Sequence, residues 1–291
     1  MFAWLKKIFK NGTAGELAAL PPPRYDLEVS VWTDVGCLRT VNEDCGRCIR
    51  PGDPDVLARK GVLAFVADGM GGHVAGEVAS RMVADGLGRA YYRHTGGPHA
   101  ALSAALTEVN QAIYQTAQDD AGLRGMGTTC TALVLRGDEA FSAHVGDSRL
   151  YLLRDGVLQA LSEDHSLVNE MVRQGLISKE EARHHEDRNV ITRALGLHPA
   201  VEVATWAAPR SVRPHDRFLL CSDGLYDLVN DEEILETMEE QPPHTAAEQL
   251  VALAKARGGH DNITVAVLWL KPLSPAPASS DGDTREVEIL S

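Results

Sequence analysis

Three aspartates stand where the sequence predicts the ends of core strands. Asp68 closes the apolar run LAFVADG, Asp223 closes FLLCSDG, and Asp261 comes just before ITVAVLWL. A strand holds such a carboxylate rigidly, and a nearby glycine lets the backbone approach the same point. A single Asp-Gly pair is typical of a β-turn, but three in matched contexts favour a shared site. Because these acids would repel one another, we expect hard divalent cations such as Mg²⁺ or Mn²⁺ between them.

A cationic side chain precedes another pair of acids in the segment RTVNED. Arg39 comes four residues before Glu43 and five before Asp44. A guanidinium group can hold a phosphate through two parallel hydrogen bonds, so Arg39 is a candidate phosphate ligand beside the cations. The alternative is a surface salt bridge. No G-x-S-x-G, G-x-x-x-x-G-K-[ST] or H-E-x-x-H motif offers a competing catalytic set.

The elements that must position these residues come in groups. The hydrophobic patterns predict the following strands: 27–35, 61–67, 128–135, 140–145, 150–153, 217–221 and 262–270. They predict the following helices: 74–92, 100–118, 166–174, 178–184 and 246–256. Strand groups separated by helix pairs, without strict alternation, indicate an α+β protein, and two stacked sheets with helices outside would satisfy the pattern.

Composition excludes some classes of function. The 291 residues carry 41 acidic against 28 basic side chains, a net charge of -13. A nucleic-acid binder needs a basic face, so we expect no nucleic-acid partner. The five cysteines are sparse, no secretory segment is recognisable, and Cys45 and Cys48 read as ordinary reduced thiols, so we expect a cytoplasmic protein.

The two ends of the chain differ from its body. Residues 1–23 combine the basic amphipathic stretch MFAWLKKIFK with a Gly/Pro-rich linker, and this stretch could touch an anionic membrane or pack loosely. Residues 272–291 are rich in proline, serine and acid and predict a disordered acidic tail. The folded domain is therefore expected over residues 24–271.

Eight segments in order carry a resemblance to a known family. They are RTVNED (39–44), VADGMGGHVAGEVAS (66–80), GMGTTCTAL (125–133), HVGDSRLYLLRDG (144–156), LSEDHSLV (161–168), ITRALG (191–196), LLCSDGLYD (219–227) and GGHDNITV (258–265). The chain closely resembles the metal-dependent protein Ser/Thr phosphatases of the PPM family (type 2C) in their compact bacterial form. The resemblance spans residues 27 to 269, and the ordered set is far more specific than any single segment.

The resemblance implies a fold and a metal centre. The fold would be a four-layer αββα sandwich, two central antiparallel sheets flanked by helices, with a flap subdomain at about 162–193. Two Mn²⁺ or Mg²⁺ ions would share one water. Asp68 would bridge both ions, Asp223 and Asp261 would complete the first, and the Gly69 carbonyl would bind the second.

The resemblance also implies supporting residues around the two ions. Asp44, acting through water, would support the second ion, and Glu43 is the alternative. Arg39 would hold the substrate phosphate. Asp147, with Asp223 and Asp227, matches a third metal position of some bacterial members.

One position departs from the family pattern. Animal members carry a histidine, a proposed general acid, where this chain has Met70, and methionine cannot donate a proton. A coordinated water or His73 would have to protonate the leaving group, and the sequence assigns neither.

These implications lead to one expected function and two alternatives. The expected function is hydrolysis of phosphoserine and phosphothreonine in phosphorylated proteins, in signalling opposite a bacterial Ser/Thr protein kinase. The chemistry needs no phosphoenzyme, because two cations can activate water and neutralise the phosphate. The alternatives are a catalytically inactive binding module and a hydrolase of small phosphate esters. Asp68, Asp223 and Asp261 are all present, which disfavours the inactive module.

Overall fold

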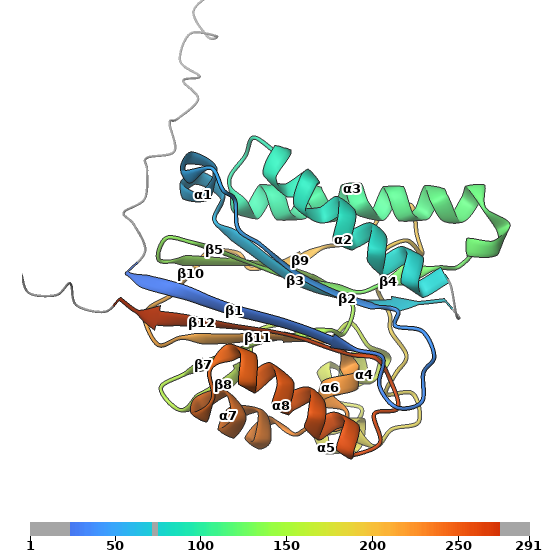
Figure 1. Ribbon diagram of the computed structural model, residues 1–291. Helices are drawn as coiled ribbons and strands as arrows, with labels where there is room; N and C mark the ends of the chain where they lie inside the picture. The colour runs from blue at the N-terminus through green and yellow to red at the C-terminus, as the bar shows by residue number, and fades with distance from the viewer. Residues whose placement is uncertain (1–23, 72–74, 274–291) are drawn as a thin grey trace, which may run out of the picture.

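Two antiparallel β-sheets lie face to face between two layers of helices (Figure 1). The computed structural model describes residues 24–71 and 75–273. The amphipathic segment 1–23, His73 and almost all of the acidic tail lie outside the described residues. The predicted α+β, αββα architecture is confirmed.

The first sheet has five strands in the order β1-β12-β11-β7-β8. Its strands are β1 (Tyr25–Asp34), β12 (Ile263–Pro272), β11 (Arg217–Cys221), β7 (Arg149–Arg154) and β8 (Val157–Ala160). The Asp155-Gly156 turn between β7 and β8 has positive φ at both residues, as a tight hairpin requires. Strand β1 pairs with β12 along its whole length, from Tyr25 opposite Pro272 to Asp34 opposite Ile263.

The second sheet has seven strands, five of them in the order β10-β6-β5-β3-β2. These are β10 (Arg210–Ser211), β6 (Glu139–Val145), β5 (Cys130–Arg136), β3 (Val62–Met70) and β2 (Asp44–Ile49). The short strands β4 (Gly127–Thr128) and β9 (Ala204–Thr205) pair with β3 and β6.

Helices cover the outer face of each sheet (Figure 1). The seven-stranded sheet carries α2 (Ala75–Arg93) and α3 (Pro98–Asp119). The five-stranded sheet carries α7 (Asp231–Glu240) and α8 (Pro243–Ala256). The shorter helices are α1 (Pro54–Lys60), α4 (Leu167–Arg173), α5 (Lys179–Arg183) and α6 (Asp223–Tyr226). Among the described residues, no helix has the length and apolar character needed to cross a membrane.

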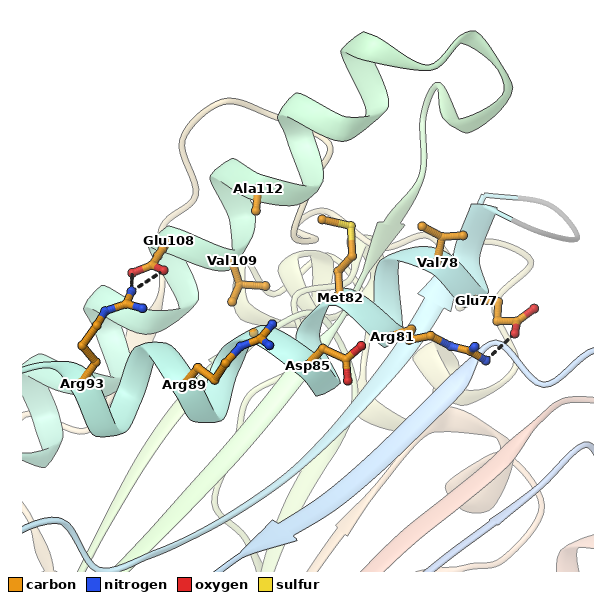
Figure 2. Close-up of a pocket in the computed structure, with 11 residues that line it drawn as sticks. Glu77, Val78, Arg81, Met82, Asp85, Arg89, Arg93, Glu108, Val109 and Ala112 are labelled. Carbon is orange, nitrogen blue, oxygen red and sulfur yellow. Dashed lines mark hydrogen bonds and ion pairs between the residues drawn. The ribbon is translucent and has the colours of Figure 1, made fainter. Parts of the chain in front are cut away.

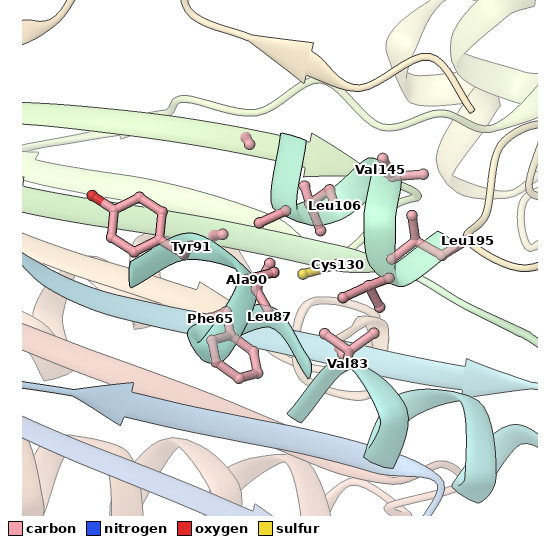
Figure 3. Close-up of a cluster of buried hydrophobic side chains, with 14 of the residues drawn as sticks. Phe65, Val83, Leu87, Ala90, Tyr91, Leu106, Cys130, Val145 and Leu195 are labelled. Carbon is pink, nitrogen blue, oxygen red and sulfur yellow. The ribbon is translucent and has the colours of Figure 1, made fainter. Parts of the chain in front are cut away.

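The continuous apolar run of β3 is explained by its two buried faces. Leu63 and Phe65 point into the core beneath α2 and α3. Figure 3 shows Phe65 in this core. Ala64 and Val66 point to the other side and pack in the core between the two sheets. Because successive side chains of a strand alternate between faces, a strand buried on both sides shows no polar alternation.

Two of the key acids differ from their predicted positions. Strand β3 continues two residues beyond Asp68, because Gly69 and Met70 pair with β4. Strand β11 ends at Cys221, and Asp223 is the first residue of α6 instead of the last of a strand. The carboxylates still lie at the edge of the sheets, which is what the prediction required.

Several elements escaped the sequence patterns. Strand β2 contains Gly46 and charged residues and forms only because it pairs with β3. Helix α7 did carry a signal, a capping box in which the Asn230 and Glu233 side chains each bond the other's backbone N–H. The predicted flap holds α4 and α5.

Candidate functional site

The acids gather at one edge of the molecule, and both sheets supply them. Asp44 opens β2 and is paired with Asp68 on β3. Asp223 follows β11 in the other sheet, and Asp261 precedes β12. Asp147 lies in the connection from β6 to β7, where the chain passes between sheets. These five residues are called the acid cluster below.

The backbone around Asp68 is fixed by hydrogen bonds. Its N–H donates to Thr129 Oγ1 at 3.0 Å, and its carbonyl accepts from Thr129 N and Thr128 Oγ1, both at 2.8 Å. The next residue must be glycine, because a Cβ on Gly69 would stand 2.2 Å from the Gly76 oxygen. Asp68 is therefore held on a rigid, closely packed support.

Side-chain bonds join the two sheets at the acid cluster. Ser222 Oγ lies 2.6 Å from Asp44 Oδ2 and donates to it across the sheets. Asn262 Oδ1 accepts from the Glu43 N–H at 2.8 Å, and Asn262 Nδ2 donates to the carbonyls of Val35 and Val41, each at 3.0 Å. Asn262 thus fixes both ends of the loop that carries Arg39.

Arg39 lies against the acid cluster and remains open to solvent. Its Nη2 is 2.8 Å from Asp261 Oδ2, and its side chain is 49% exposed. An incoming phosphate could therefore reach the guanidinium from the solvent side.

Burial and mutual repulsion disfavour the charged form of carboxylates in the acid cluster. Burial, followed by repulsion from neighbouring acids, raises the pKa of Asp68 and of Asp223 well above the ordinary value. Burial is also the main cause that raises the pKa of Asp44 to about 6 and that of Asp147 to about 7. Such raised values are typical of sites that need a cation.

The donor set fits a hard divalent cation. All its side-chain donors are carboxylate oxygens, and Asp147 Oδ1 is buried without a hydrogen-bond partner among the described residues. Within those same residues, no three His, Cys, Asp or Glu side chains already surround a single point as metal ligands would. The fold places these carboxylates at one edge, and rotation of their side chains alone would change the distances between them. Their burial and mutual repulsion therefore still indicate a cation site.

The remaining predicted residues take these positions. Glu43 is buried beside Asp44, and its carbonyl accepts the Gly69 N–H at 3.1 Å. Asp227 directly follows α6 as its C-cap, and burial raises its pKa. Met70 ends β3, where it pairs with Gly127. Sequence reasoning missed Ser222 and Asn262, although each stands next to a predicted aspartate.

A cavity of about 770 Å³ lies elsewhere, between α2 and α3 (Figure 2). Ion pairs between Arg81 and Glu77 at 2.5 Å and between Arg93 and Glu108 at 2.7 Å occupy its rim. None of the predicted site residues lines this cavity. The cavity is therefore separate from the acid cluster, which is identified by its buried carboxylates and the hydrogen bonds that hold them.

Fold and site together define an αββα sandwich with a cation-suited acidic edge. The family model described as protein phosphatase 2C matches residues 55–256. The chain belongs to the protein phosphatase 2C family. It is 41% identical over 239 residues to the serine/threonine phosphatase stp of Listeria monocytogenes serovar 1/2a, covering 80% of this chain and 92% of that protein. It is 42% identical over 242 residues to the serine/threonine protein phosphatase PstP of Mycobacterium tuberculosis, covering 83% of this chain but only 44% of that longer protein.

Solved structures share the fold. The crystal structure of the Mycobacterium tuberculosis serine/threonine phosphatase PstP/Ppp matches with a TM-score of 0.75 at 41% identity, covering 84% of this chain and 99% of that one. The catalytic domain of PstP in complex with two manganese ions matches with a TM-score of 0.73 at 41% identity, covering 84% of this chain and 98% of that one.

Proposed function

We propose that this protein is a metal-dependent phosphatase that hydrolyses phosphoserine and phosphothreonine in other proteins. The observation that carries the proposal is the buried acid cluster, built from both sheets beside Arg39, in a chain of the protein phosphatase 2C family. Its relatives named serine/threonine phosphatases support the substrate class. The manganese ions of the PstP structure support the choice of metal.

Each residue of the site has a proposed task. Asp68, Asp223 and Asp261 would hold the first Mn²⁺ or Mg²⁺ ion. Asp68 and the Gly69 carbonyl would hold the second, supported by Asp44 or Glu43. Asp147 would take part in a third site with Asp223 and Asp227.

The bound ions and the chain divide the chemistry. Bound Mn²⁺ or Mg²⁺ would lower the pKa of water and offset the charge of the phosphoryl group. Arg39 binds the phosphate, and its contact with Asp261 aims the guanidinium at the cluster. Met70 carries no transferable proton, so the proton for the leaving hydroxyl group must come from another donor.

We further propose that the protein acts in the cytoplasm, in signalling, where it reverses a bacterial Ser/Thr protein kinase. The phosphoprotein class of substrate requires a kinase as its source. The five cysteines are all free thiols, as a reducing compartment allows. Cys45 packs toward the helices and Cys48 toward the other sheet. The two thiols therefore lie on opposite faces of β2.

Phosphate release from a phosphothreonine peptide tests the proposal. We expect activity with Mn²⁺, complete loss in excess EDTA and recovery when Mn²⁺ is added back. Asp223→Asn should lower kcat by at least about 100-fold, since it removes a charged ligand. The matched control is Asp85→Asn, which alters an aspartate that pairs with Arg47 on the surface and should keep parent activity.

Two results would contradict the proposal. Activity that persists in EDTA would point to a mechanism without metal. Faster turnover of nucleotides than of phosphopeptides would favour a small-ester hydrolase.

A further inference from the structure

Arg149 makes an unusually complete set of contacts beside the acid cluster. It is the first residue of β7, two positions after Asp147. Its Nη2 lies 2.7 Å from Asp164 Oδ2, and its Nε lies 3.1 Å from both carboxylate oxygens. The two side chains are only 29% and 18% exposed. A forked, half-buried pair of this kind holds its partners more firmly than an exposed ion pair does.

The same guanidinium stacks on the helix that carries Asp223. Its central carbon lies 3.6 Å from the centre of the Tyr226 ring, at the end of α6. The Tyr226 hydroxyl donates to the Asp147 carbonyl at 3.1 Å. Lysine could keep the charge of Arg149 but neither the fork nor the flat stacking face.

Asp164 stands at the entry of the segment 165–192, which contains α4 and α5. The His165 N–H donates to the Gly146 carbonyl at 2.7 Å, and the Gly146 N–H donates to His165 Nδ1 at 3.0 Å. The Thr192 N–H in turn donates to the His165 carbonyl at 2.8 Å. Both ends of the segment therefore meet at the residue before Asp147.

We propose that Arg149 and Asp164 are a positioning pair that holds the segment 165–192 against residues 146–147 and aims the Asp147 carboxylate into the acid cluster. Neither side chain is assigned a contact with substrate. A change that loosens the segment 165–192 should then also weaken cation binding at Asp147. Asp147 Oδ1, which is buried and lacks a hydrogen-bond partner among the described residues, is the atom that would receive the cation. This inference rests on the proposed function.

Three variants and a matched control test the pair. Arg149→Lys keeps the charge, Asp164→Asn keeps the shape, and the double variant combines them. The control is Arg154→Lys at the other end of the same strand, where Arg154 makes a similar forked pair with Asp216, with bonds of 2.7 and 2.6 Å. Mn²⁺ binding is measured by calorimetry, with Asp147→Asn marking the site in question. Hydrogen exchange of residues 165–192 is measured with and without Mn²⁺.

Asp147→Asn should remove one Mn²⁺ site. Arg149→Lys and Asp164→Asn should each raise the Kd of Mn²⁺ at that site by about 10-fold, the usual effect of losing a group that orients a ligand. Exchange in 165–192 should rise by a similar factor. The double variant should be no worse than either single one, because both remove the same contact. Arg154→Lys should change neither readout, even if it lowers the melting temperature.

The outcomes separate this inference from the proposed function. If the parent binds Mn²⁺ and hydrolyses phosphopeptide while Arg149→Lys and Asp164→Asn match Arg154→Lys in both readouts, the positioning role is wrong and the proposed function stands. Additive effects in the double variant would likewise refute a shared role. A parent that binds no Mn²⁺ overturns the proposed function and the link to cation affinity together.

Discussion

At the scale of single residues, Asp68 opposes folding of the metal-free protein while serving the proposed chemistry. Its raised pKa shows that burial and neighbouring acids disfavour the ionised form. We expect Asp68→Asn, in EDTA at pH 8, to increase the free energy of unfolding by about 1–3 kcal/mol, because one repelling charge is gone. The same variant should lose Mn²⁺-dependent activity. Urea unfolding and a phosphopeptide assay measure the two effects.

A buried aspartate elsewhere provides the control for Asp68. Asp216 is 1% exposed and accepts bonds from Arg154 and from the Arg213 N–H at 2.9 Å. Asp216→Asn should therefore decrease the free energy of unfolding by about 1–3 kcal/mol, since it weakens a satisfied pair. Equal signs for Asp68→Asn and Asp216→Asn would contradict this explanation.

His144 should make the protein sensitive to acid. It is 4% exposed, with Nδ1 2.8 Å from Thr131 Oγ1, and burial lowers its pKa from 6.5 to about 4. The unfolded chain therefore takes up this proton first, so the stability contribution is complete above pH 6.5 and is lost as the pH falls toward 4. Between pH 7 and 5 the parent should lose about 1–2 kcal/mol more than His144→Gln. Urea unfolding at both pH values checks this, and equal losses would rule it out.

At the scale of elements, the loop from β1 to β2 depends on one amide side chain. Asn262 bonds the carbonyls of Val35 and Val41 and the N–H of Glu43, and Arg39 lies between these points. Asn262→Ala should raise KM for a phosphopeptide by about 10-fold, because Arg39 loses its fixed orientation.

A second asparagine separates this loop effect from general destabilisation. Asn230→Ala removes the N-cap of α7 and should leave KM unchanged. Steady-state kinetics of both variants give the comparison. A KM for Asn262→Ala equal to that of Asn230→Ala would show that the loop does not depend on Asn262.

The elements also show what the sequence could and could not predict. Runs buried on both faces, such as that of β3, and long amphipathic helices, such as α2 and α3, were predicted with small boundary errors. Strand β2 could not be predicted from the sequence, because its strand pairing is with β3 alone and its own residues have weak strand preference. Within the site, the aspartates could be predicted from their residue type and their positions near strand ends. Ser222 and Asn262 could not, because their roles depend on contacts across the two sheets.

At the scale of the whole molecule, the acid cluster lies where the two sheets meet. Asp44 and Asp68 belong to one sheet, and Asp223 and Asp261 flank strands of the other. Cations bound here would tie both halves of the sandwich together. At 100 times Kd, Mn²⁺ should add about 2.7 kcal/mol per site to the free energy of unfolding. This would raise the melting temperature by about 5–10 °C.

Calorimetry of the full chain with and without Mn²⁺ measures this shift. Asp223→Asn should abolish most of it, and Asp85→Asn should keep it. A shift of the same size in Asp223→Asn would place the stabilising ion somewhere else.

The pairing of β1 with β12 has a practical consequence. Tyr25 and Pro272 lie side by side at one end of the pair, and Asp34 and Ile263 lie at the other, next to Asp261 (Figure 1). Ten residues of strand separate the two ends by about 33 Å. A reporter protein joined at Tyr25 or at Pro272 would thus be attached at the end of the strand pair that lies away from Asp261.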